Sequence, residues 1–249
     1  MKTCVIILFC LISSMAVLGQ NETKQINVDV DEVQVTPPKF TGVENAAEMY
    51  TGEQLQLINQ FIAKHFESPL QPILCNYEGT EVIEFTITPA GQLTDFNVIN
   101  SVCREVDKEL IRVLKGTNGM WLPGSNNGKS AAMEYEVSMM FGDYSQDEII
   151  NHFVGQSEKY FTRGSKTLLV EQQPRKALKY FDKSMRYTPN DKATLLLHGI
   201  CSYELGKTEN AKRDWNRIVS LGGIDYSINE DQLTEMKGYS EMIKILAGK

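Results

Sequence analysis

Residues 79–141 decide the fold, and they read GTEVIEFTITPAGQLTDFNVINSVCREVDKELIRVLKGTNGMWLPGSNNGKSAAMEYEVSMMF. Two runs of alternating apolar side chains flank the turn residues 89–91, which predicts a β-hairpin. The apolar spacing then changes to that of a helix over 107–115. Residues 126–129 are predicted as a loop and 132–141 as a last strand. The order of elements predicts an α+β domain.

The segment before this domain divides into a polar and a periodic part. Residues 20–36 are acidic and show little helical periodicity, which predicts a flexible leader. Pro37-Pro38 then stops regular structure. From 52 to 66 the apolar positions fall at helical spacing, and Ser68-Pro69 is expected to end that helix.

The first 19 residues are predicted to be a signal peptide. Lys2 supplies a positive charge, Val5–Leu11 is an apolar run, and cleavage is expected before Gln20. The stretch is shorter than the roughly 20 residues that span a bilayer. Export to the periplasm or cell envelope follows, with retention of the segment as an anchor as the alternative.

Three cysteines remain after such a cleavage, Cys75, Cys103 and Cys201. Cys75 precedes the predicted hairpin and Cys103 follows it, so these two are the candidate disulfide in an oxidising compartment. Three reduced, buried thiols are the alternative. Cys201 lies on an apolar helical face and is expected to be a small core residue.

Four motifs in this order resemble the C-terminal domain of the TonB energy-transducer family. They are the first hairpin with Gly79, Ile83, Phe85, Ile87 and Gly91; the helix motif Val106–Val113; the loop Trp121-x-Pro123-Gly124; and Asn127-Gly128-Lys129. Upstream, Pro38-Lys39-Phe40 and the helix expected to end at Pro69 resemble the Bacteroidetes-type version of this family. From the residues themselves, the glycines suit positive φ and Trp121 is the large apolar anchor between helix and sheet.

The resemblance implies a three-stranded antiparallel sheet with helices, and an edge strand that captures an extended peptide. The implied partners are outer-membrane TonB-dependent transporters, whose peptide would add a strand to the sheet. The candidate edge residues are Ala132, Glu134, Tyr135, Glu136, Val137, Ser138 and Met139.

The C-terminal part repeats itself at an interval of 34 residues. Ala177 corresponds to Ala211, and Phe181 corresponds to Trp215. This resembles two tetratricopeptide repeats, in which small residues let paired helices approach and an aromatic side chain fills the space between them. Further packing positions are expected at Pro189, at Gly199 and at its counterpart Ser165. Residues 229–246 have helical spacing and are predicted to cap the array.

The predicted organisation therefore has five parts. They are the signal peptide 1–19, the leader 20–36, the TonB-like domain 37–142, a linker 143–156, and two repeats with a capping helix over 157–249.

The chain shows no pattern typical of catalysis or cofactor binding. His65, His152 and His198 are scattered without metal-ligand spacing, so no metal site is expected. No glycine-rich phosphate loop lies between a strand and a helix. The formal net charge of −7 argues against nucleic acid as a partner. We therefore expect a non-enzymatic protein without cofactors.

Two functions remain after these exclusions. The first is a cell-envelope adaptor linked to TonB-dependent transmembrane transport, which binds a partner peptide by strand addition. The second is a periplasmic or secreted repeat scaffold in which the TonB-like domain is only structural. Both functions are compatible with self-association of the chain into a homodimer.

Overall fold

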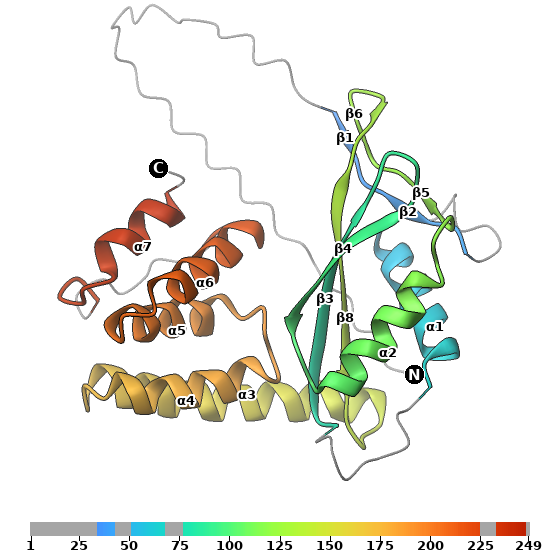
Figure 1. Ribbon diagram of the computed structural model, residues 1–249. Helices are drawn as coiled ribbons and strands as arrows, with labels where there is room; N and C mark the ends of the chain where they lie inside the picture. The colour runs from blue at the N-terminus through green and yellow to red at the C-terminus, as the bar shows by residue number, and fades with distance from the viewer. Residues whose placement is uncertain (1–33, 43–50, 68–76, 225–232, 248–249) are drawn as a thin grey trace, which may run out of the picture. The chain divides into compact units, whose positions relative to one another are not determined.

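The fold is known from a computed structural model, which describes residues 34–42, 51–67, 77–224 and 233–247. Within these residues the chain is an α+β protein with small antiparallel sheets and seven helices (Figure 1). The predicted signal peptide, most of the predicted leader and Cys75 lie outside the described residues.

The central sheet has the predicted three antiparallel strands, in the order β4-β3-β8. They are β3 (Gly79–Ile87), β4 (Leu93–Asn100) and β8 (Met133–Phe141). The tight turn between β3 and β4 contains Gly91, whose φ of 73° lies in the left-handed region that favours glycine. This confirms the hairpin and the last strand of the sequence prediction.

Helices α1 (Thr51–His65) and α2 (Arg104–Lys115) bury one face of this sheet. Helix α2 begins at Arg104, three residues before the predicted start, and Cys103 before it is still extended. Trp121 closes this core, as predicted: its ring packs against Phe85, and its Nε1–H donates to Thr117 Oγ1 at 2.9 Å. The fully buried core side chains include Phe40, Ile58, Ile62, Ile83, Phe85, Ile87, Leu110, Leu114 and Val137.

Short strands join the N-terminal segment to the loop that follows α2. They are β1 (Val35–Thr36), β2 (Lys39–Phe40), β5 (Trp121–Leu122), β6 (Ser125–Asn126) and β7 (Lys129–Ser130). Strand β1 pairs with β6, so the end of the predicted leader belongs to a sheet. The predicted loop 126–129 is a hairpin turn, because Asn127 and Gly128 take φ values of 50° and 77°.

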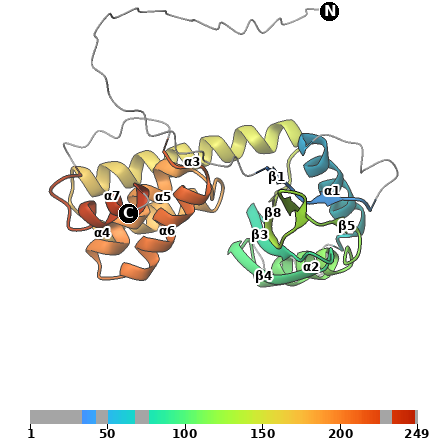
Figure 2. The ribbon, with the colours of Figure 1, turned by 90° about the horizontal axis from the view of Figure 1, so that it is seen from above.

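The C-terminal part is helical, as expected from its periodicity (Figure 2). Its helices are α3 (Gln146–Leu169), α4 (Pro174–Met185), α5 (Lys192–Glu204), α6 (Thr208–Ser220) and α7 (Tyr239–Leu246). Helix α3 occupies most of the segment 143–156 that was predicted as a linker. It starts there because Ser145 and Glu148 form a capping box, and because Phe153 is buried.

Candidate functional site

Strand β8 is a regular edge strand. All nine of its residues pair with β3, from Met133 opposite Ile87 to Phe141 opposite Gly79. Within the described residues it has no strand on its other side. The opposite edge, β4, is less regular: its pairing with β3 shifts register twice, and Asp95 has a φ of 53°. Such irregularities make an edge a poor template for a further strand.

The predicted edge residues lie on β8 with one exception, since Ala132 precedes the strand. Tyr135, Val137 and Met139 face α1 and α2: Val137 is fully buried, and the Tyr135 ring lies 4.9 Å from the Trp121 ring. Glu134, Glu136 and Ser138 point to the other face, because successive side chains of a strand alternate. The strand thus has an apolar row and a polar row.

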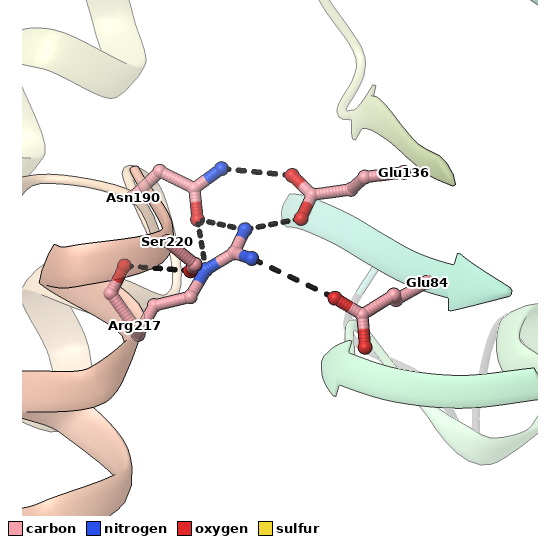
Figure 3. Close-up of polar contacts among 5 residues, drawn as sticks. All are labelled: Glu84, Glu136, Asn190, Arg217 and Ser220. Carbon is pink, nitrogen blue, oxygen red and sulfur yellow. Dashed lines mark hydrogen bonds and ion pairs between the residues drawn. The ribbon is translucent and has the colours of Figure 1, made fainter. Parts of the chain in front are cut away.

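Two carboxylates face each other on the polar side of this sheet. Glu84 of β3 and Glu136 of β8 are directly paired in register, and each is 26% exposed. Like charges in this position destabilise a sheet. The guanidinium of Arg217 from α6 lies between them, hydrogen-bonded to Glu136 Oε2 and 4.0 Å from Glu84 Oε2 (Figure 3).

Asn190, in the turn between α4 and α5, holds this arrangement in place. Its Oδ1 accepts hydrogen bonds from Arg217 Nε and Nη2 at 3.3 and 2.8 Å. Its Nδ2 donates to Glu136 Oε1 at 3.0 Å, as Figure 3 shows. We call Glu84, Glu136, Asn190 and Arg217 the carboxylate bridge. It connects the candidate edge strand with the helices.

A second group of polar contacts joins the start of β3 to the end of α4. The backbone N–H of Thr80 donates to the carbonyl oxygen of Arg186 at 2.9 Å, and the Thr80 hydroxyl donates to the backbone carbonyl oxygen of Tyr187 at 2.5 Å. Arg186 Nε donates to the Glu78 carbonyl at 2.6 Å. A Cβ on Gly79 would lie 3.0 Å from the Arg186 oxygen, and the φ of Gly79 is 151°. The predicted need for glycine therefore comes from the helical part as well as from the strand.

The residues predicted to pack the repeats are buried in the helical core. Ala177, Phe181, Ala211 and Trp215 have no exposed surface, and Pro189 is also buried. A Cβ on Gly199 would lie 2.8 Å from Cε2 of the Trp215 ring, which explains why this position holds glycine.

The counterpart of Gly199 in the first repeat differs from the prediction. It is Gly164, where a Cβ would lie 2.7 Å from Cε1 of the Phe181 ring. Ser165 is only half-buried. A strict interval of 34 residues missed Gly164 because the two glycines are 35 residues apart, while the aromatic residues keep the interval of 34.

His198 joins three consecutive helices and was not predicted as a functional residue. Its Nδ1 lies 2.6 Å from Asp214 Oδ2 of α6, and its Nε2 lies 3.1 Å from Asp182 Oδ1 of α4. Burial alone lowers the pKa of the imidazole, but the hydrogen bonds to both aspartates outweigh this effect and raise the pKa to about 9. The side chain is therefore a largely buried cation at neutral pH.

A groove of about 550 Å³ lies between β4 and the helices, and we call it the strand–helix groove. Its lining includes Asn97, Ile99, Asp182, His198, Arg213 and Arg217. No residue spacing along the sequence indicated it, because its walls come from segments about 100 positions apart.

The cysteines differ in state. Cys103 is disulfide-bonded. Its predicted partner Cys75 lies outside the described residues, so that pairing stays a prediction. Cys201 is a free thiol in the helical core, and burial raises its pKa to about 12, so it is present as the unreactive thiol.

The described part of the chain contains no group of three or more histidine, cysteine or acidic side chains that could hold a metal ion. No helix in that part is long and apolar enough to cross a membrane. Comparisons of the chain with protein-family models, curated proteins and solved structures found no match.

Proposed function

We propose that this protein binds an extended peptide of a partner protein, which adds as a strand to β8. The observation that carries the proposal is the unbroken pairing of Met133–Phe141 with β3 on one edge only. Backbone hydrogen bonds along such an edge provide affinity, and alternate side chains provide specificity. The protein acts as an adaptor without catalysis.

The two rows of β8 specify the chemistry of that peptide. Side chains on one face would continue the row of Tyr135, Val137 and Met139, and should be apolar. Side chains on the other face would lie beside Glu134 and Ser138, where a cation gains a favourable cross-strand pair. An extended segment that alternates apolar and basic residues therefore suits this edge.

The resemblance of the motifs to the TonB family supports a role in the cell envelope, in TonB-dependent transmembrane transport. Periplasmic-side segments of outer-membrane transporters are the first partners to test. The predicted signal peptide agrees with this location, since it would export the chain.

The experiment measures the binding of synthetic peptides to the full chain by fluorescence anisotropy. One peptide alternates valine and lysine, a second alternates valine and glutamate, and others are taken from the transporters. The matched control is the valine–lysine peptide with alternate backbone amides N-methylated, because it keeps the side chains but cannot form the ladder. Glu134→Lys should reverse the preference between the first two peptides. Equal binding of the N-methylated peptide would exclude strand addition.

The second candidate function is a scaffold that uses its helices, and the strand–helix groove favours it. Asn97 is exposed on β4 and lines this groove, so Asn97→Trp should fill it. If Asn97→Trp abolishes binding of a partner while Glu134→Lys does not, the helical part is the working surface. The opposite result supports strand addition to β8.

A further inference from the structure

A separate groove of about 660 Å³ lies on the helical part and is rich in cations. Arg175, Lys176 and Lys179 of α4 line it together with Lys207, which precedes α6. Leu178 and Leu205 supply its apolar lining. We call these six residues the basic groove. Asp182 also lines it, and is the only acidic residue to do so within the described part.

The cations of the basic groove are mostly unpaired. Lys176 Nζ lies 3.5 Å from Glu171 Oε2. Among the described residues, no ion pair involves Arg175, Lys179 or Lys207. The Asp182 carboxylate is already engaged by His198. Four cations around one engaged carboxylate are unexpected in a chain of net charge −7, so this surface is locally opposite in sign to the whole protein.

The positions of these cations are also unfavourable for the helices themselves. Arg175 lies in the first turn of α4, which has no acidic residue there, and Lys207 is the N-cap of α6. The positive end of the helix dipole repels cations at both places. In neither helix does the side chain of the N-cap residue accept a hydrogen bond from the first turn. In α6, Glu209 of the first turn offsets part of this repulsion, whereas α4 has no such residue, so a bound anionic group would relieve the repulsion mainly at α4.

We infer that the basic groove binds an acidic, extended segment of a partner protein. Arg175 and Lys179 are four residues apart on one helical face, about 6 Å along the axis. Side chains two residues apart in an extended segment are about 6.7 Å apart and lie on the same side. Two carboxylates in this spacing match the two cations, and an apolar side chain of the segment packs on Leu178 and Leu205. A nucleic acid is disfavoured by the charge of the whole chain.

This site is independent of β8 and needs its own probe. The test uses the full chain and a fluorescein-labelled ten-residue peptide with glutamates at alternate positions around a central leucine. The same peptide with glutamine in place of glutamate is the control. We expect the glutamate peptide to bind at least tenfold more tightly, and to lose about tenfold in affinity between 50 and 300 mM salt.

Variants locate the binding on the groove. Lys179→Glu combined with Lys207→Glu should lower the affinity more than tenfold, and the milder pair Lys179→Gln and Lys207→Gln should have a smaller effect in the same direction. Lys108→Glu, on the exposed surface of α2, makes the same change in charge for each substitution and should alter the affinity less than twofold. Thermal unfolding followed by circular dichroism verifies that each variant is folded. If the double glutamate variant does not fold, the double glutamine variant decides the test.

Three outcomes would overturn the inference. The glutamine peptide could bind as tightly as the glutamate peptide, or Lys108→Glu could weaken binding as much as the groove variants. The third is tighter binding of a single-stranded RNA oligonucleotide of equal charge, which would assign the groove to nucleic acid.

Discussion

Replacing the buried carboxylic acid Glu81 by glutamine should raise the free energy of unfolding relative to the wild type, and this gain should grow as the pH rises. Glu81 has no exposed surface on β3, and burial raises its pKa to about 8, with the nearby Asp107 carboxylate adding to the effect. Its Oε2 accepts a hydrogen bond from the Val102 N–H at 2.7 Å, whereas Oε1 has no partner within the described residues. The folded protein therefore keeps Glu81 protonated at neutral pH.

The magnitude follows from the difference between the folded and unfolded pKa. The unfolded side chain ionises near its ordinary value of 4.5. The folded state thus holds one more proton between pH 4.5 and about 8, and the free energy of unfolding falls as the pH rises through this window. At 1.36 kcal/mol for each pKa unit, the loss between pH 5 and pH 8 is about 3 kcal/mol. Glutamine has the same shape and no such titration.

The assay is urea unfolding of the wild type and Glu81→Gln at pH 5, 6, 7 and 8. The variant should gain about 3 kcal/mol relative to the wild type across this range. The comparison at each pH cancels the contribution of other titrating groups. Glu158→Gln, at an exposed position of α3, is the control and should show no such trend. A difference between wild type and Glu81→Gln that stays constant with pH would refute the reasoning.

Three further predictions concern the helical part. The pKa of His198 is raised, so the stabilisation that this side chain provides is complete below pH 6.5 and is lost as the pH rises through about 9. His198→Gln should therefore lower the free energy of unfolding by about 3 kcal/mol at pH 6 and by much less at pH 10, as measured by urea unfolding. Gly199→Ala should lower the free energy of unfolding by about 1–3 kcal/mol, because the new Cβ meets the Trp215 ring. Gly155→Ala, whose Cβ meets no atom within 4 Å, should raise it by up to about 1 kcal/mol. Thermal unfolding tests both variants, and a change in stability of the same sign for the two would contradict the prediction. Arg217→Ala should lower the free energy of unfolding by about 2 kcal/mol, because it leaves the Glu136 carboxylate opposite that of Glu84. In a double-mutant cycle, adding Glu136→Gln should recover part of this stability, whereas additive losses would show that Arg217 and Glu136 are not coupled.

The local elements of the fold could be predicted because their signals lie close together in the sequence. The alternation through Ile83, Phe85 and Ile87 indicated β3, and the apolar spacing from Val106 to Leu114 indicated α2. The glycine at 91 also matched its turn. Burial on one face is enough to determine such elements.

The errors concern two segments and one packing position. Val35–Thr36 was assigned to the flexible leader because the residues before it are acidic, although valine and threonine both favour strands; it is extended and pairs with β6. Helix α3 starts within the predicted linker, where Ile149 and Phe153 are buried four residues apart; this helical spacing of apolar residues was present in the sequence and was overlooked. Ser165 was predicted as the counterpart of Gly199, although the small residue that accommodates Phe181 is Gly164.

The polar residues of the site were the hardest to predict. Glu84 and Glu136 are unremarkable in sequence and become a like-charge pair only once β3 and β8 are in register. Arg217 lies 81 positions after Glu136, so nothing local connects them. Glu81 did carry a signal: it is in phase with the buried Ile83 and Phe85, and a charged residue in that row predicts a perturbed carboxyl group.

Hydrogen exchange along β8 tests the central proposal most directly. Amide exchange of Met133–Phe141 is measured by mass spectrometry in the full chain, with and without the valine–lysine peptide at a saturating concentration. Strand addition predicts that exchange in this segment slows at least tenfold, while exchange in β4 is unchanged. Saturation by the peptide without any slowing in β8 would contradict the proposal.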